Sequence, residues 1–246
     1  MPVRLFHVSD IHFGREDKAA VAWFESTVRA ERPDAVVMTG DLTMRARSHE
    51  FAAACTWAER LGVPVTVEVG NHDLPYFNPW ARLVSPYRRF RKLERAIERP
   101  LDLPGVLIVP LKTTARAQWR RNWSWGVVSR RSLAEALALI EAERGNRLAL
   151  VACHHPLADP TGHTRPEANT VRGGEALAAL ASAGATAVLT GHVHDPFDVV
   201  HDAAGHPIRL IGAGTLSERV RTSAPSFNEL IVEAGLLSVK PRQMMM

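Results

Sequence analysis

The sequence contains little cysteine and no long apolar run, and these two absences exclude several classes of protein. Only two cysteines, Cys55 and Cys153, occur among 246 residues, so a disulfide framework is excluded and we expect free thiols. No apolar run approaches the ~20 residues of a membrane-spanning helix. The first residues already have the pattern of a strand and lack that of a signal peptide. We therefore expect a soluble, cytoplasmic protein.

Disorder is also excluded, because apolar residues make up 46% of the chain and are spread along it. A chain of this length can bury a large core, and we expect one domain over residues 1–246. The formal charge of +4 does not by itself indicate a nucleic-acid partner, and we expect none.

One segment, at about residues 74–104, has a different composition from the rest of the chain. Prolines and aromatic residues punctuate it, and the stretch from Arg82 to Arg99 carries seven Arg or Lys against Glu94 and Glu98. We interpret the segment as an irregular insertion with a basic helix at about residues 87–98. Its basic face is either solvated or in contact with an anionic substrate, and the sequence leaves both readings open.

Alternating apolar and amphipathic segments predict an α/β fold. The patterns predict strands at 3–8, 35–39, 63–69, 106–111, 148–152 and 186–189, and helices at 16–32, 48–61, 132–145 and 174–183. Ser48 is the expected cap of one helix, and Ser132 with Glu135 has the form of a capping box. This alternation implies parallel strands with right-handed crossovers. Shorter strands at 197–201, 208–211, 227–232 and 237–239 predict antiparallel hairpins.

Side chains of the types that bind metals follow five of the expected strands. They lie in Asp10-x-His12, Gly40-Asp41, Gly70-Asn71-His72-Asp73, His154-His155-Pro156 and Gly191-His192-x-His194. Groups at the carboxyl ends of strands in an open α/β sheet meet at one rim, and residues two apart in an extended segment point to the same side. Carboxylates and imidazoles gathered there unpaired would carry a large desolvation cost, which a pair of cations relieves. Nitrogen and oxygen donors without thiolate favour Mn, Fe, Zn or Co.

These five blocks, in this order, resemble the pattern D-x-H, G-D, G-N-H-[DE], H and G-H-x-H of the calcineurin-like metallophosphoesterase superfamily. The blocks span Asp10 to His194. The size and the His-His-Pro run are most similar to the branch of bacterial class III cyclic-nucleotide and glycerophosphodiester phosphodiesterases. The resemblance implies a four-layer α/β/β/α sandwich, in which two facing mixed sheets are flanked by helices.

The resemblance also implies a role for each residue of the motifs. Asp10, His12 and His194 would hold one metal ion, Asn71, His154 and His192 would hold the other, and Asp41 would bridge them. His72 would act as the general acid or contact the phosphate, and Asp73 would orient it. The implied reaction is hydrolysis of a small phosphodiester by a metal-bridging hydroxide. A homodimer is left open.

Several alternatives share these motifs. They are a phosphomonoesterase, a pyrophosphatase of lipid-linked sugar nucleotides, a DNA nuclease and a scaffold that has lost its metals. Complete ligand positions favour an enzyme over a scaffold, and the modest basic charge disfavours a nuclease. The aromatic residues of the insertion leave the lipid pyrophosphatase open.

Outside the motifs, we expect several of the other histidine, cysteine and tryptophan residues to have a structural role. We expect His7 and Cys153 to be packed in the core, and the tryptophans of residues 119–125 to be core or interface residues. His163 lies in a loop long enough to approach the site.

Overall fold

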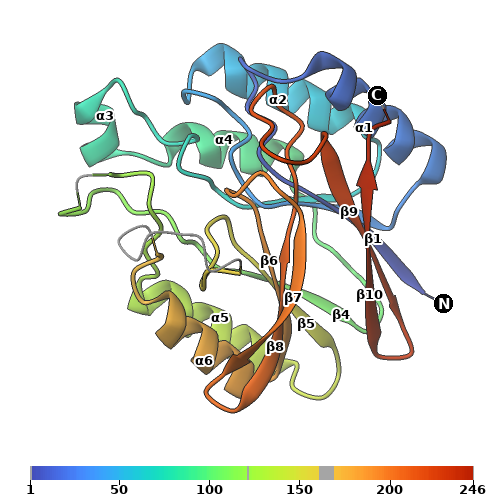
Figure 1. The fold of residues 1–246 in the computed structure, drawn as a ribbon. Coiled ribbons are helices and arrows are strands. Elements are labelled where there is room, and N and C mark those ends of the chain that lie inside the picture. Colours follow the sequence, from blue (N-terminus) through green and yellow to red (C-terminus); the bar gives the residue numbers. More distant parts are fainter. Residues whose placement is uncertain (1, 121, 161–168, 246) are drawn as a thin grey trace.

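The chain folds into two facing five-stranded sheets with helices on their outer sides (Figure 1). The computed structural model describes residues 2–120, 122–160 and 169–245. The strands are β1 (Val3–Val8), β2 (Ala35–Met38), β3 (Val65–Val67), β4 (Val106–Pro110), β5 (Leu148–Ala152), β6 (Ala185–Thr190), β7 (Phe197–Ala203), β8 (His206–Gly212), β9 (Ser226–Glu233) and β10 (Leu236–Gln243). The helices are α1 (Lys18–Glu31), α2 (Ser48–Arg60), α3 (Pro79–Val84), α4 (Arg88–Ile97), α5 (Arg130–Ala142) and α6 (Gly173–Ser182).

Both sheets are mixed. In the first, ordered β10-β9-β1-β2-β3, the strands β1, β2 and β3 are parallel, and β9 runs antiparallel to β1 and to β10. In the second, ordered β4-β5-β6-β8-β7, only β7 is antiparallel to its neighbour. The expected C-terminal hairpins are confirmed. They belong to different sheets, since β7 and β8 complete the second sheet and β9 and β10 complete the first.

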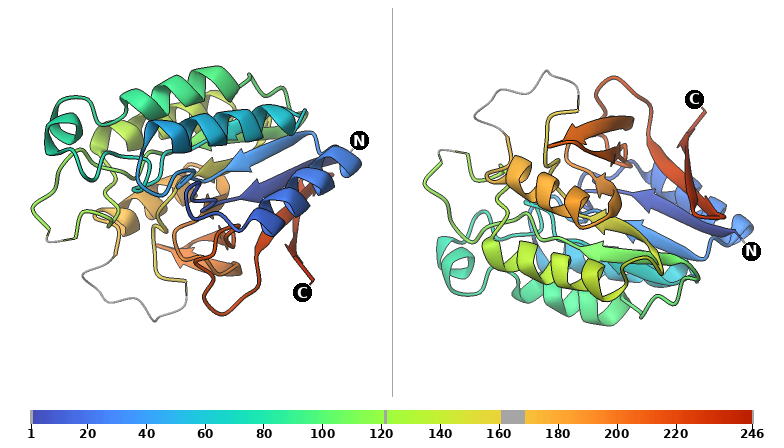
Figure 2. Two further views of the ribbon diagram at one scale, coloured as in Figure 1. Left: turned by 90° about the horizontal axis from the view of Figure 1, so that it is seen from above. Right: turned by 90° about the horizontal axis from the view of Figure 1, so that it is seen from below.

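Three apolar cores separate the four layers. Helices α1, α2 and α4 cover the first sheet, and α5 and α6 cover the second (Figure 2). Alternate residues of β1 show how one strand serves two cores, because Phe6 packs against Phe24 of α1 while Leu5 faces the second sheet. Burial on both faces explains the nearly continuous apolar runs of the inner strands, such as β2, β5 and β6. The predicted four-layer sandwich is confirmed.

Two predicted helix caps are wrong, the cap of α5 by three residues and that of α2 by one. The side chain of Ser129 caps α5 by accepting a hydrogen bond from the backbone N of Ser132 (3.0 Å), so the expected capping box at Ser132 does not form. The Ser132 hydroxyl is buried and donates to the carbonyl of Lys112 (3.3 Å). In α2, Ser48 is the first helical residue and follows the cap position. Tertiary contacts and neighbouring residues thus decide which serine becomes the cap.

The insertion is more ordered than predicted. It holds the expected basic helix, α4, and also the short helix α3, which Asn78 caps by accepting a hydrogen bond from the backbone N of Ala81 (2.9 Å). Arg82 of α3 is only 5% exposed and donates to the carbonyl oxygens of Ala115 and Arg116 (both 3.0 Å). Arg82 therefore has a structural role, and only the α4 part of the basic stretch has a solvated face.

Several expectations about single residues hold. Cys55 and Cys153 are free thiols, and both Cys153 and His7 are buried in the core. His163 lies outside the described residues. Among the described residues, none of the helices is both long and apolar enough to cross a bilayer.

Candidate metal centre

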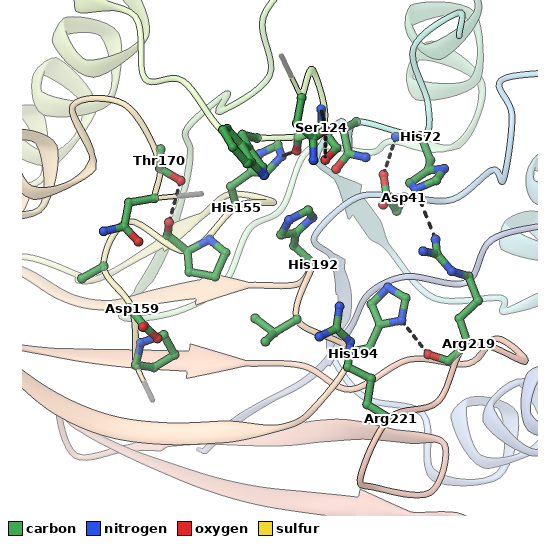
Figure 3. Close-up of a pocket in the computed structure, with 18 residues that line it drawn as sticks. Asp41, His72, Ser124, His155, Asp159, Thr170, His192, His194, Arg219 and Arg221 are labelled. Atoms are coloured by element: carbon green, nitrogen blue, oxygen red, sulfur yellow. Dashed lines mark hydrogen bonds between the residues drawn. The ribbon is translucent and has the colours of Figure 1, made fainter. Parts of the chain in front are cut away.

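The predicted ligands all lie where strands of the two sheets end at one rim. Asp10, Asp41 and Asn71 follow β1, β2 and β3 of the first sheet, and His154 and His192 follow β5 and β6 of the second. Figure 3 shows His192, His194 and Asp41 around one hollow. The site therefore lies between the two sheets and depends on how they face each other.

The backbone is left-handed at the ligands of Asp10-x-His12 and His192-x-His194, which corrects the expectation of extended segments. The φ angles of Asp10 and His12 are 56° and 53°, and those of His192 and His194 are 69° and 68°. Such angles cost L-residues roughly 1–2 kcal/mol each. Hydrogen bonds between loops hold them in place, such as those from the backbone N of Asp10 to the carbonyl of Gly40 (3.1 Å) and from that of His12 to the carbonyl of Asp41 (3.0 Å).

One cluster joins Asp10, His12 and His194. Nδ1 of His194 donates to the carbonyl of Arg219 (2.7 Å), so in the neutral ring Nε2 carries a lone pair. That nitrogen lies 3.1 Å from Oδ1 of Asp10, and Nε2 of His12 lies 3.5 Å from the same oxygen. Oδ1 of Asp10 is buried and has no hydrogen-bond partner among the described residues. Lone pairs that face each other repel, so the arrangement fits a cation or a proton between them.

A second cluster has the same construction around His154. Nδ1 of this ring donates to the carbonyl of Thr39 (2.7 Å), and Nε2 faces Oδ1 of Asn71 (3.1 Å) and Oδ2 of Asp41 (3.3 Å). The ring of His192 lies edge-on to it, with the centroids 5.2 Å apart. Here too, two oxygens and two imidazoles surround a position that suits a cation.

Asp41 lies between the clusters. Its Oδ2 is 3.3 Å from Nε2 of His154 and 3.8 Å from Nε2 of His12. Its Oδ1 accepts a hydrogen bond from the backbone N of His72 (2.8 Å), which fixes the plane of the carboxylate. A carboxylate that is shared by two neighbouring metal ions must lie between their ligand clusters, as Asp41 does.

The charges of the site are strongly coupled. Burial opposes ionisation of Asp10 and Asp41, but the surrounding imidazoles outweigh it and lower the pKa of both carboxyls. Burial also lowers the pKa of His192, to about 3, aided by repulsion from His154. For His154, attraction to Asp41 outweighs burial and raises the pKa to about 9.

His155 lies close to both rings of the second cluster, but its nitrogens are engaged elsewhere. Nε2 donates to the carbonyl of Ser124 (2.8 Å), and Nδ1 accepts from the hydroxyl of Thr113 (2.9 Å). His155 therefore positions the loop that carries Ser124 and offers no free nitrogen to a metal.

The expected contact between Asp73 and the His72 ring is wrong. Nδ1 of His72 donates to the carbonyl of Met44 (2.8 Å). The buried carboxylate of Asp73 accepts hydrogen bonds from the backbone N of Thr43 (2.8 Å) and of Gly70 (3.0 Å). Burial, followed by repulsion from Asp41, raises the pKa of Asp73 to about 6. Neighbouring side chains in a tight turn point in different directions, so Asp73 does not reach the ring of His72. Asp73 instead ties the loop after β2 to the loop after β3.

Sequence reasoning missed the loop between β8 and β9. Nη1 of Arg219 lies 3.2 Å from Nε2 of His72 (Figure 3). The same atom lies 3.5 Å from Nε2 of His12. Arg221 also lines the hollow. No motif marks these arginines, and the only signal in the sequence is a pair of cations two residues apart in a loop.

Two hollows adjoin the centre and share Asn71, His72, Asn122 and Ser124. The polar cavity, of about 340 Å³, is lined further by polar and charged residues such as Asp41, His155, His192, Arg219 and Arg221, and by apolar residues such as Trp125, Pro156 and Val193. The aromatic groove, of about 960 Å³, is lined further by Met44, Arg45, Pro75, Tyr76, Phe77, Pro79, Arg82 and Trp123. Trp123 is exposed at this groove, and Trp119 is fully exposed. Of the expected core or interface roles, exposure excludes the core for Trp119, and an interface role stays a prediction.

Comparisons with known proteins agree with this geometry. The family model of calcineurin-like phosphoesterases matches residues 3–196. A dimetal phosphatase from Danio rerio is similar in structure, with a TM-score of 0.72 at 14% identity, over 98% of this chain and 96% of that chain. A purple acid phosphatase from yellow lupin seeds has a TM-score of 0.65 at 11% identity, over 99% of this chain and 52% of its own.

Phosphopantetheinyl hydrolase from Mycobacterium tuberculosis has a TM-score of 0.56 at 18% identity, over 86% of this chain and 89% of its own. A comparison with curated protein sequences finds no significant match. The solved structures share the fold, and the family model covers the segment that carries all of the motifs. The chain therefore belongs to the calcineurin-like phosphoesterase family and is a metal-dependent hydrolase of phosphoesters.

Proposed function

We propose that this protein is a phosphodiesterase with two metal ions. The ligands in this proposal are Asp10, His12 and His194 for one ion and Asn71, His154 and His192 for the other, with Asp41 shared. The supporting observation is that imidazole and carboxylate lone pairs face each other in both clusters, with one carboxylate between them. When bound, a pair of divalent cations lowers the pKa of a shared water and neutralises charge on the phosphate oxygens. Mn, Fe, Zn and Co all suit these donors.

His72 and Arg219 contribute groups of the chain itself. His72 is fixed through its Nδ1, and its Nε2 accepts a hydrogen bond from Nη1 of Arg219 (3.2 Å). In the imidazolium form, Nε2 would carry a second proton that can pass to the leaving oxygen. The guanidinium of Arg219 lies beside that nitrogen and can donate to a phosphate oxygen. Asp73 acts only by holding the two loops together.

The two hollows support a diester rather than a monoester. A phosphodiester carries two ester groups, and each needs room on its own side of the phosphorus. The polar cavity and the aromatic groove both reach Asn71 and His72 from different sets of residues. A monoester would leave one of them unused. The similarity to the class III branch, a single domain, a homodimer and a cytoplasmic location stay predictions.

A turnover screen with Mn²⁺ present tests the proposal. It compares bis-(p-nitrophenyl) phosphate, p-nitrophenyl phosphate, cyclic nucleotides and glycerophosphodiesters. We expect hydrolysis of diesters, with the monoester a poorer substrate. Cleavage of the monoester alone would refute the diesterase and leave the metal centre standing.

Asp41→Asn tests the shared ligand separately. We expect this variant to lose bound metal in elemental analysis, together with at least about 100-fold in turnover, because a ligand common to both ions is weakened. Full metal content with undiminished turnover would remove Asp41 from the site.

The aromatic groove also favours a second candidate, a pyrophosphatase of lipid-linked nucleotides. Such a substrate has an apolar part that an aromatic surface can bind. Adding a lipid-linked nucleoside diphosphate to the screen separates this reaction from simple diester hydrolysis.

A further inference from the structure

We infer that the aromatic groove binds a hydrocarbon ester group, so that the preferred phosphodiesters carry one apolar arm and one polar arm. This inference rests on the proposed phosphodiesterase activity and names the class of its substrate. It comes from the unequal chemistry of the two hollows beside the metal centre.

The groove is formed by aromatic side chains that face solvent. Tyr76 is 75% exposed and Phe77 is 67% exposed, and their rings meet edge to face with centroids 5.2 Å apart. Single exposed aromatic residues are ordinary on protein surfaces. Here they gather, with Trp123, around a hollow that ends at Asn71 and His72. Apolar walls that converge on a few polar groups are typical of a ligand site.

Contacts within the protein hold the wall of the groove in place. Arg82 is buried behind it and anchors α3 to the carbonyl oxygens of Ala115 and Arg116. The Arg82 guanidinium lies 5.7 Å from the centroid of the Trp123 ring, and that of Arg45 lies 5.6 Å from the centroid of the Phe77 ring. These cations contact rings and carbonyls, so the surface left to a ligand is mainly apolar. An apolar wall that such contacts hold in place lowers the entropy cost of binding.

The other hollow also has apolar walls, such as Trp125 and Val193, but it carries cations as well. Thr170, Arg219 and Arg221 line it, and the hydroxyl of Thr170 donates to the carbonyl of Pro156 (2.7 Å), which fixes its wall. A hydrocarbon placed there would leave cations without water or a partner, which is unfavourable. The polar arm of the diester therefore belongs in the polar cavity, and the apolar arm in the aromatic groove.

Phosphinates test the groove without catalysis. Methyl(alkyl)phosphinates keep the single negative charge of a diester but have two P–C bonds, so they cannot be hydrolysed. We expect affinity for the Mn-loaded protein, measured by isothermal titration calorimetry, to rise about two-fold per added methylene from methyl to heptyl. That is the gain from burying about half of each methylene. A benzyl arm, also of seven carbons, distinguishes a ring from a chain. A gain with either arm supports the inference, and equal affinity for methyl, heptyl and benzyl overturns it.

Phe77→Ala and Trp119→Ala form a matched pair of variants. Both side chains are exposed, so both proteins should fold, but only Phe77 lines the groove. We expect Phe77→Ala to remove most of the gain with chain length and Trp119→Ala to keep it. If both variants keep the rise in affinity with chain length, or both lose it equally, the groove is not the source of that rise and the inference is overturned.

Kinetics with p-nitrophenyl alkyl phosphates separate this inference from the proposed activity. A rise of kcat/KM with the alkyl chain supports both. Cleavage that is independent of chain length, with flat phosphinate affinity, overturns the groove and keeps the phosphodiesterase. No cleavage of any diester, with rising phosphinate affinity, overturns the phosphodiesterase and keeps the groove.

Discussion

Gly70 is the position where one methyl group should damage the centre most directly. It precedes Asn71, and its α-carbon lies against the loop that carries Asp41. A Cβ added at Gly70 would fall well inside van der Waals contact with the carboxylate and with the backbone N of Asp41. Because one of these atoms belongs to the backbone, a rotation of the side chain alone cannot relieve the overlap.

The size of the effect follows from the overlap. The two loops must separate by about 1 Å to regain ordinary contact. Overpacking of this kind costs roughly 1–3 kcal/mol in the free energy of unfolding. A displacement of about 1 Å in a positioning group can lower a rate by about 100-fold. Weakened support of a ligand costs about 10- to 100-fold in metal affinity. For Gly70→Ala we therefore expect a moderate loss of stability and a large loss of Mn²⁺ binding and turnover.

Gly174→Ala is the matched control. Gly174 lies in the first turn of α6, and an added Cβ there meets no atom within 4 Å. The same chemical change should stabilise this helix by up to about 1 kcal/mol and leave the metal centre unchanged. Urea unfolding of the metal-free proteins and calorimetric Mn²⁺ titration measure both effects. If Gly70→Ala bound Mn²⁺ and turned over substrate as well as Gly174→Ala does, the close approach of the two loops would not matter for the site.

Three further predictions concern charge and metal. Arg219→Ala should lower kcat/KM for a diester by about 10- to 100-fold, the range for a lost hydrogen bond to a charged group. Arg131→Ala, on the exposed side of α5, is the control and should leave kcat/KM unchanged. Equal kcat/KM values for the two variants in steady-state assays would contradict a contact between Arg219 and the phosphate. Burial, and then repulsion from Glu98 and Glu94, raise the pKa of Glu68 well above 4.5, so the folded state holds this proton more tightly and stability falls as the pH rises above 4.5. Glu68→Gln should therefore gain stability over the wild type between pH 5 and pH 8 in urea unfolding, and a constant difference would argue against an ionised, buried Glu68. Removal of metal by a chelator should lower the unfolding temperature, and Mn²⁺ at about 100 times its Kd should restore about 2.7 kcal/mol; thermal unfolding that does not respond to Mn²⁺ would contradict binding to the folded state.

The fold was predictable because it rests on local patterns. Apolar runs such as that of β5 and amphipathic stretches such as that of α1 fix element type through periodicity, and their alternation restricts the topology. Boundaries were less predictable. Ser129 rather than Ser132 became a cap because the Ser132 hydroxyl found a partner in Lys112, a contact that no local pattern contains.

The order and spacing of Asp10, His12, Asp41, Asn71 and the later histidines are properties of the sequence by itself. They follow strand ends, and parallel strands bring their ends to one rim, so the presence of a metal centre could be inferred before any coordinates.

Only the tertiary structure decided which atoms of that rim face one another. The left-handed backbone at His192, the engagement of His155 with Ser124, the turning of Asp73 away from His72 and the arrival of Arg219 all depend on contacts between residues far apart in the chain. The aromatic groove likewise exists only because α3 is anchored to the loop of Trp123. Periodicity records which side of a strand or helix is buried, but it carries no information about the partner that a side chain meets across the interior.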